Sequence, residues 1–472
     1  MQEKRIWFSI LALGVLLQIL AAVFMPLGLD AHVHSTYVSD EIADGDSTLD
    51  WGHLRIDGSN QSVAEEIPAD DKWFVWHGII EIWFSIFGIS LMSLHVLGLI
   101  LSFSALGVVY YCTKSLWGKG NAIALTAILS IYSPLVRSTG RLYQESIVIL
   151  CATIILYSIV KILRKENHKF WHLICLIFLA SILSIKGLPA KYALYLYLPI
   201  LSLEVYRPNY RPVKKLTLLA ITVAITSALV WIRLDKLPAD MIIILPITIF
   251  IAGIIYLYIG MLLFSMNSKE TNFESNYFSL LSQLVFAGLC GYITMLFLVE
   301  MDTLEASRSI VQDRFRYIYR YVTVLAVPLW WAQMAKQDGP AIELKDNKNR
   351  SVMSIIIALM IIINSYMLTF DRGIEELGEE LYDEIEDGEN ILYIADPPLA
   401  MHRLYTLQIT TDPGHDRNIT AYWADENIDW SSILVENQIS WVIITDDTIN
   451  YLDENWVVFE TRTSHEVYHL VE

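Results

Sequence analysis

The sequence has few cysteines and, over its last hundred residues, no lysine. Four cysteines occur in 472 residues, and each lies in or beside a long apolar run: Cys112, Cys151, Cys175 and Cys290. The disulfide framework of a small secreted domain is therefore not expected. Residues 372–472, which we call the acidic tail, hold 23 acidic residues and four arginines. An acidic surface without lysine argues against nucleic acid and against anionic lipid as partners of this part of the chain.

The sequence lacks a dinucleotide-binding motif and a complete set of ligands for a metal-dependent barrel hydrolase. No GxGxxG follows the first strand expected in the acidic tail, so dinucleotide binding is not supported. The stretch "LDAHVHSTYVSD", Leu29 to Asp40, has the Asp-x-His-x-His pattern of barrel hydrolases that bind metals. Such a barrel needs further ligands on later strands, but here the motif follows an apolar span and no second histidine pair faces outward. No cofactor is expected to be required, although the spacing of Asp30 and His34 permits a divalent ion shared with another loop.

Long apolar runs dominate the chain instead. The mean hydropathy is +0.44, and 54% of the residues are hydrophobic. Runs long enough to cross the ~30 Å hydrocarbon core of a bilayer recur along the chain, so we expect a polytopic α-helical membrane protein. The expected spans, about eleven in number, lie near 7–28, 89–112, 121–136, 146–163, 171–186, 189–205, 216–233, 241–264, 278–299, 318–335 and 351–370.

Basic residues predict the orientation of these spans. Lys4 and Arg5 precede the first span, and later basic loops fall on the same side if the N-terminus is cytoplasmic. The other basic positions are Lys114, Lys119, Arg164, Lys165, Lys169, Arg207, Arg211, Lys214, Lys215, Lys336, Lys345, Lys348 and Arg350. The first loop, 29–88, and the acidic tail then face outward from the cell membrane. The sequons at Asn60 and Asn418 lie on that side and are potential glycosylation acceptors.

The chain is expected to form two domains. Residues 1–371 would form the membrane domain, and residues 372–472 a small extracytoplasmic α/β domain. In the acidic tail, apolar residues recur at helical spacing from Ile374 to Ile385, and "NILYIAD" and "SWVIITDD" read as short strands. The closing "WVVFETRTSHEVYHLVE" predicts a hairpin.

Three outward segments carry aromatic or charged residues. "KWFVWHGIIEIWFSIFG", Lys72 to Gly88, predicts an aromatic helix in the membrane interface, or else the early part of the second span. "SPLVRSTGRLYQES", Ser133 to Ser146, places Arg141 and Glu145 four residues apart, on one face if the fourth span begins early. The loop from Glu300 to Val322 holds several arginines where positive charge is normally scarce, so protein acids or a phosphate are expected as partners.

The order of these segments resembles the GT-C superfamily of membrane glycosyltransferases. The likeness is to the branch of dolichyl-phosphate-mannose protein mannosyltransferases and aminoarabinose transferases. It is carried by "LDAHVHSTYVSDEIADGD", "KWFVWHGIIEIWFSIFG", "SPLVRSTGRLYQESIVIL" and "RFRYIYRYVTVLAVPLWW". Three features depart from the pattern. The usual acidic pair is Asp30-Ala31 here, the spacing from Arg320 to Pro328 is one residue longer, and "WWAQM" lacks the aspartate of the oligosaccharyltransferase motif.

The resemblance implies an inverting glycosyltransferase of the cell membrane. A sugar would move from a polyprenyl (dolichyl) phosphate donor to a hydroxyl of a glycan, lipid or protein acceptor, as in protein mannosylation or cell-envelope glycosylation. Asp30 would be the general base, and Glu145 would orient the acceptor or pair with Arg141. Arg316 and Arg320 would bind the lipid phosphate, with Arg141 as an alternative. His34 and His77 would contact donor or acceptor.

Alternative roles for the chain are a lipid-linked sugar transporter or flippase, or a non-catalytic membrane protein of the glycan pathway. Transporters usually place ionisable groups at mid-membrane. Here most expected spans have no acid near their centre, and the acids gather in the outward segments. This distribution favours chemistry at the membrane surface.

Overall fold

The fold is taken from a computed structural model that describes most of the chain outside residues 202–346. The described residues are 2–45, 54–56, 62–64, 73–201 and 347–471, with short gaps in the last two ranges, and a few positions from 326 to 334. Three predicted spans between 216 and 299, most of the span at 318–335, Arg316, Arg320, Asn60 and Asn418 lie outside these residues.

The chain divides into two compact units. The bundle unit comprises Met1–Gln18, Leu101–Ser138 and Gln144–Asn364. The sheet unit comprises Ile19–Ile100, Thr139–Tyr143 and Ser365–Glu472. The acidic tail therefore belongs to the same unit as the first loop.

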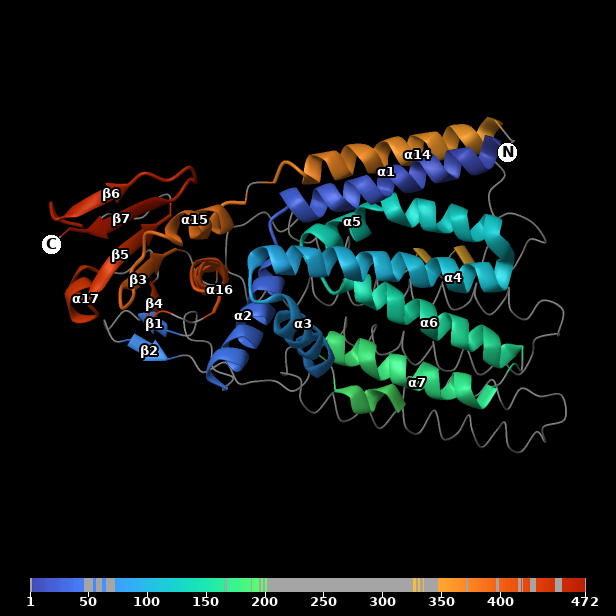
Figure 1. The fold of residues 1–472 in the computed structure, drawn as a ribbon, viewed down its shortest axis with the longest axis horizontal. Coiled ribbons are helices and arrows are strands. Elements are labelled where there is room, and N and C mark those ends of the chain that lie inside the picture. The colour runs from blue at the N-terminus through green and yellow to red at the C-terminus, as the bar shows by residue number, and fades with distance from the viewer. Residues whose placement is uncertain are drawn as a thin grey trace, which may run out of the picture. The chain divides into compact units, whose positions relative to one another are not determined.

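Helices, most of them long and apolar, make up the described part of the bundle unit (Figure 1). They are α1 (Gln2–Phe24), α4 (Leu91–Ile131), α5 (Ser133–Gly140), α6 (Glu145–Leu163), α7 (His168–Ile185), the short η2 (Ala190–Tyr192) and α14 (Asn347–Met367), of which α1, α4, α5 and α14 also extend into the sheet unit. Three of the described helices are long and apolar enough to cross a membrane: Arg5–Phe24, Leu91–Ile131 and Glu145–Ile162. The chain is a helical integral membrane protein, as its apolar runs predict.

A kink divides α4 into two helices. Gly118 has φ 84° and ψ 168°, which is not helical and is open to glycine because it has no Cβ. The kink falls in the basic segment between 112 and 121, where the sequence predicts a break between the second and third spans.

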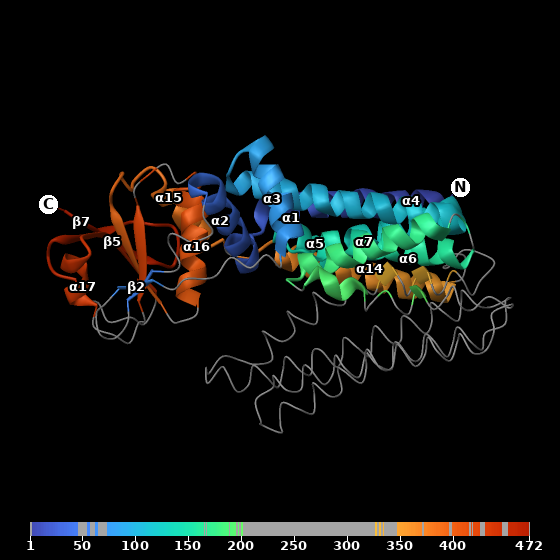
Figure 2. The same ribbon diagram turned by 90° about the horizontal axis from the view of Figure 1, so that it is seen from below.

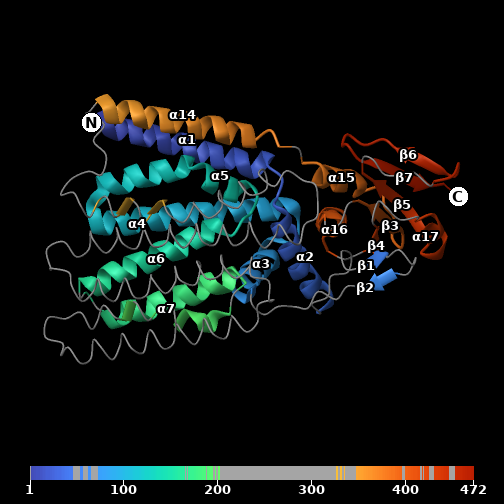
Figure 3. The same cartoon turned by 180° about the vertical axis from the view of Figure 1, so that it is seen from behind.

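Helix α14 lies beside α1 (Figures 1 and 3). Its residues Met353, Ile357 and Met360 pack against a core cluster that includes Trp7 and Ile10 of α1.

A seven-stranded sheet forms the core of the sheet unit, in the order β2-β1-β4-β3-β5-β7-β6. Its strands are β1 (Leu54–Ile56), β2 (Ser62–Ala64), β3 (Asn390–Ile394), β4 (Thr420–Ala424), β5 (Ile439–Ile444), β6 (Trp456–Phe459) and β7 (Glu466–Leu470), with helices α15 (Ile374–Leu381), α16 (Leu399–Thr411) and α17 (Ser431–Glu436). Strand β3 pairs in parallel with β4 and β5, and β6 with β7 form an antiparallel hairpin. The two strands, the helix and the hairpin predicted in the acidic tail are confirmed.

The first loop supplies two strands that the sequence analysis did not predict. Strand β1 pairs in parallel with β4, with Arg55 opposite Trp423, and β2 pairs with β1 in antiparallel register. Each strand has three residues, too few to show an alternating pattern. The first loop and the acidic tail thus share one sheet.

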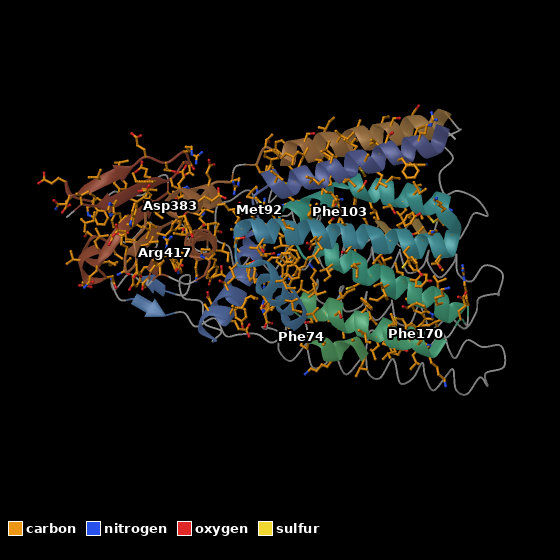
Figure 4. All side chains as sticks on the ribbon, viewed as in Figure 1. Phe74, Met92, Phe103, Phe170, Asp383 and Arg417 are labelled. Carbon is orange, nitrogen blue, oxygen red and sulfur yellow. The ribbon has the colours of Figure 1, made fainter. Side chains whose placement is uncertain are left out.

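Two helices of the first loop complete the sheet unit. Helix α2 (Leu29–Asp44) lies beside α16 (Figure 2) and also contacts α3 (Phe74–Phe87). Helix α3 ends before α4, because Gly88 caps it with φ 78° and its N–H bonds to the carbonyl of Phe84. The aromatic segment is therefore a helix of its own and not the start of the second span. It buries Trp76, Ile80 and Phe84 and exposes apolar side chains that include Phe74 (Figure 4), as an interfacial helix does.

Candidate functional site

Helix α2 presents two different polar faces. Asp30, His34, Tyr37 and Glu41 follow one another at intervals of three or four residues, and their side chains are exposed or half-buried. The opposite face is buried and is also polar, with His32, Ser35, Thr36, Ser39 and Asp40 all at most 1% exposed. A helix with one buried polar face needs hydrogen-bond partners for that face.

Asp30 lies in the first turn of α2 and is exposed. Only Met25 to Leu29 separate it from the end of α1, a helix apolar enough to cross a membrane. The backbone N–H groups at a helix N-terminus favour a negative charge nearby. This position suits an ionised carboxylate that stays reachable from solvent.

The turn before Asp30 is tightly held by the segment around Arg141. The N–H of Gly28 donates to the carbonyl of Arg141 at 2.9 Å, and Nη2 of Arg141 donates to the carbonyl of Leu27 at 3.4 Å. A Cβ on Gly28 would lie 2.2 Å from Cε1 of Tyr143, so only glycine fits there. In this structure the backbone carbonyl and the guanidinium of Arg141 therefore both bind the turn before α2.

The buried face of α2 bonds to the acidic tail. Thr36 Oγ1 donates to the carbonyl of Tyr405 at 3.1 Å, and Ser39 Oγ donates to the carbonyl of Pro413 at 2.7 Å. Nε2 of Gln408 donates to Oδ1 of Asp40 at 3.0 Å. Nε2 of His32 lies 2.8 Å from Oε1 of Glu375, which also belongs to the acidic tail. Sequence reasoning missed this face, although the run of Ser, Thr and Asp at helical spacing was a signal for it.

The structure brings His34 and His77 together. Nδ1 of His34 lies 2.9 Å from Nε2 of His77, a hydrogen bond that needs one neutral ring as acceptor. The ring centroids of Tyr37 and His77 are 4.6 Å apart, and the ring centroids of His34 and Trp73 are 5.4 Å apart. Burial lowers the pKa of His77 from 6.5 to about 4, so this ring is neutral at pH 7. The pair lies on the side of α2 that carries Asp30.

Glu145 belongs to the bundle unit, where it begins α6 and is 3% exposed. Nζ of Lys186 donates to its Oε1 at 2.9 Å. The predicted helical pairing of Glu145 with Arg141 does not apply, because α5 ends at Gly140, α6 begins at Glu145, and Leu142 between them has φ 48°. Sequence reasoning missed Lys186, which is the last residue of the predicted fifth span, 171–186.

The remaining predicted site residues are not described. Arg316 and Arg320 lie outside the described residues, so their role as phosphate ligands stays a prediction. Within the described ranges, no three histidine, cysteine, aspartate or glutamate side chains are grouped to hold a metal ion. The divalent ion that Asp30 and His34 permit also stays a prediction.

Comparisons with known proteins give only remote likenesses. No protein-family model and no curated protein matches the chain. Among solved structures, ArnT from Cupriavidus metallidurans in the apo state is 12% identical, with a TM-score of 0.45 over 98% of this chain and 97% of that chain. The same protein bound to undecaprenyl phosphate is 10% identical, with a TM-score of 0.40 over the same shares. At these values the likeness carries no conclusion about activity.

Proposed function

We propose that this protein is an integral membrane glycosyltransferase that moves a sugar from a polyprenyl phosphate to an acceptor hydroxyl. The observation that carries the proposal is the setting of Asp30, an exposed carboxylate in the first turn of a helix that follows a membrane-length helix. The sequence resemblance to the GT-C superfamily supports the same assignment. Within that superfamily, the branch of mannosyltransferases and aminoarabinose transferases fits the motif order.

The reaction needs a base and a cationic group. Asp30 takes the proton of the acceptor hydroxyl as its oxygen attacks the anomeric carbon from the face opposite the phosphate. The bond from the anomeric carbon to the phosphate oxygen breaks, its electron pair stays on the lipid phosphate, and the sugar inverts. Positive charge must stabilise this leaving group. Arg316 and Arg320 are the proposed donors, because a guanidinium binds phosphate with two parallel hydrogen bonds.

Other residues have supporting roles in the proposal. His34 and His77 offer ring nitrogens and flat faces beside the Asp30 side of α2, suited to contact with donor or acceptor sugar. Glu145, held by Lys186, is the second acid and orients the acceptor. Arg141 is the alternative phosphate ligand. Its guanidinium also has a structural role, because it donates to the Leu27 carbonyl. The proposed acceptor lies on the outer face of the cell membrane.

The test is sugar transfer by Asp30→Asn, measured with purified protein in proteoliposomes and radiolabelled polyprenyl-phosphate hexose. Loss of a general base lowers the transfer rate about 10²- to 10⁴-fold. Glu41→Gln is the matched control, because it removes an exposed carboxylate from the same helix three turns later and should keep wild-type transfer. Unaltered transfer by Asp30→Asn would remove Asp30 as the base, and vesicle transport of labelled donor without any transfer would favour a flippase.

A further inference from the structure

Glu375 is an acid buried beneath the start of α2. It lies in the first turn of α15 and its side chain is 1% exposed. Oε1 accepts the N–H of Leu27 at 2.6 Å and Nε2–H of His32 at 2.8 Å. Oε2 lies 3.6 Å from Nε of Arg372. One carboxylate of the acidic tail therefore binds the chain at two points, Leu27 just before α2 and His32 within it.

These two points stand on either side of Asp30. Leu27 comes three residues before Asp30, and His32 comes two residues after it. Glu375 therefore binds the buried side of the start of α2, while the side chain of Asp30 is exposed. Burying a carboxylate is costly, and an apolar contact of the same shape often stabilises a fold as well. What the buried acid adds is geometry, because its two hydrogen bonds restrict the rotation of α2 and its position along the helix axis.

A second set of contacts removes the remaining freedom of the helix. Just before α2, the carbonyl of Leu27 accepts a hydrogen bond from the Arg141 guanidinium, and the N–H of Gly28 donates to the Arg141 carbonyl. Further along α2, Thr36, Ser39 and Asp40 bond to the segment from Tyr405 to Pro413. The contacts of Thr36, Ser39 and Asp40 run to the acidic tail. Together with Glu375 they set the direction in which the opposite face, with Asp30, points.

We propose that Glu375 is a positioning residue, which acts through Leu27 and His32 to aim Asp30 at the acceptor hydroxyl. The proposal rests on the function proposed above, in which Asp30 is the base. It makes the acidic tail part of the catalytic unit and not a solubilising appendage. A base displaced by about 1 Å costs transfer on the order of 10²-fold.

The matched pair of variants is Glu375→Gln and Glu380→Gln in the full chain. Glu380 is five residues later in the same helix, α15, and bonds to Thr461 and Arg462 within the tail. Glu375→Gln should lower kcat about 10- to 100-fold with the KM for the lipid donor within about twofold of wild type, and Glu380→Gln should keep both constants. Amide hydrogens of Leu29–Asp44 should exchange faster in Glu375→Gln and at the wild-type rate in Glu380→Gln.

The two readouts separate the failure of this proposal from that of the function. If wild-type protein transfers no sugar, the proposed function fails, while exchange in α2 still decides whether Glu375 holds the helix. Unchanged kcat and unchanged exchange in Glu375→Gln, or equal losses in both variants, overturn the proposal. If Glu375→Gln does not fold, His32→Ala replaces it and should show the same kcat loss, and His32→Gln, which keeps an N–H donor, should restore most of the rate.

Discussion

Replacing Gln408 with leucine tests whether hydrogen bonding holds the buried face of α2. Gln408 is 1% exposed, Asp40 is fully buried, and Nε2 of the glutamine donates to Oδ1 of the aspartate at 3.0 Å. Leucine nearly preserves the volume but removes the donor. A hydrogen bond to a charged group contributes about 1.5–3 kcal/mol to the free energy of unfolding, and we expect Gln408→Leu to lose about that amount.

Thermal unfolding of the purified protein in detergent, followed by intrinsic fluorescence, measures this loss. For a unit of about 150–250 residues, 1 kcal/mol corresponds to about 2–4 °C, so the midpoint should fall by about 3–12 °C. The double variant Asp40→Leu/Gln408→Leu then reports the coupling of the pair, which should exceed about 0.5 kcal/mol. A wild-type midpoint for Gln408→Leu, or additive losses in the double variant, would refute the argument that this bond fixes α2 on the acidic tail.

Burial lowers the pKa of His77 from 6.5 to about 4, so the unfolded state binds more protons in this window and stability should fall as the pH falls from 6.5 to 4; unfolding midpoints of His77→Gln should show a smaller pH slope. Lys186→Met leaves the buried carboxylate of Glu145 without this partner, so its midpoint should be lower than that of Lys186→Met/Glu145→Gln. Gly28→Ala forces a Cβ against the Tyr143 ring and should cost about 1–3 kcal/mol of stability, part of which Tyr143→Leu should restore in the same unfolding assay.

The features that the sequence predicted are the local ones. Apolar runs located α1, α6 and α14, and short apolar segments located β3, β5 and the closing hairpin, because each has a length or period that can be read along the chain. The aromatic helix α3 was expected for the same reason, and its end at Gly88 decided between the two alternatives.

The contacts that arrange the candidate site could not be predicted in this way. His32 and Glu375 are 343 residues apart in the sequence, and no local pattern in either segment predicts that the two side chains meet. The spacing of Arg141 and Glu145 suggested a helical pair, but the positive φ of Leu142 turns the chain between them. Spacing rules hold only inside one helix, and here two helices meet.

These long-range contacts change what a deletion of the acidic tail would mean. Without residues 372–472, His32 and Asp40 lose the partners Glu375 and Gln408, and the buried face of α2 loses its backbone acceptors as well. Unpaired buried polar groups cost about 1–3 kcal/mol each, and more when charged. A truncated protein would therefore lose sugar transfer through disorder of the helix that carries Asp30, whether or not the tail touches substrate. Point variants that change one side chain at a time, such as Glu375→Gln, separate these roles because they leave the sheet in place.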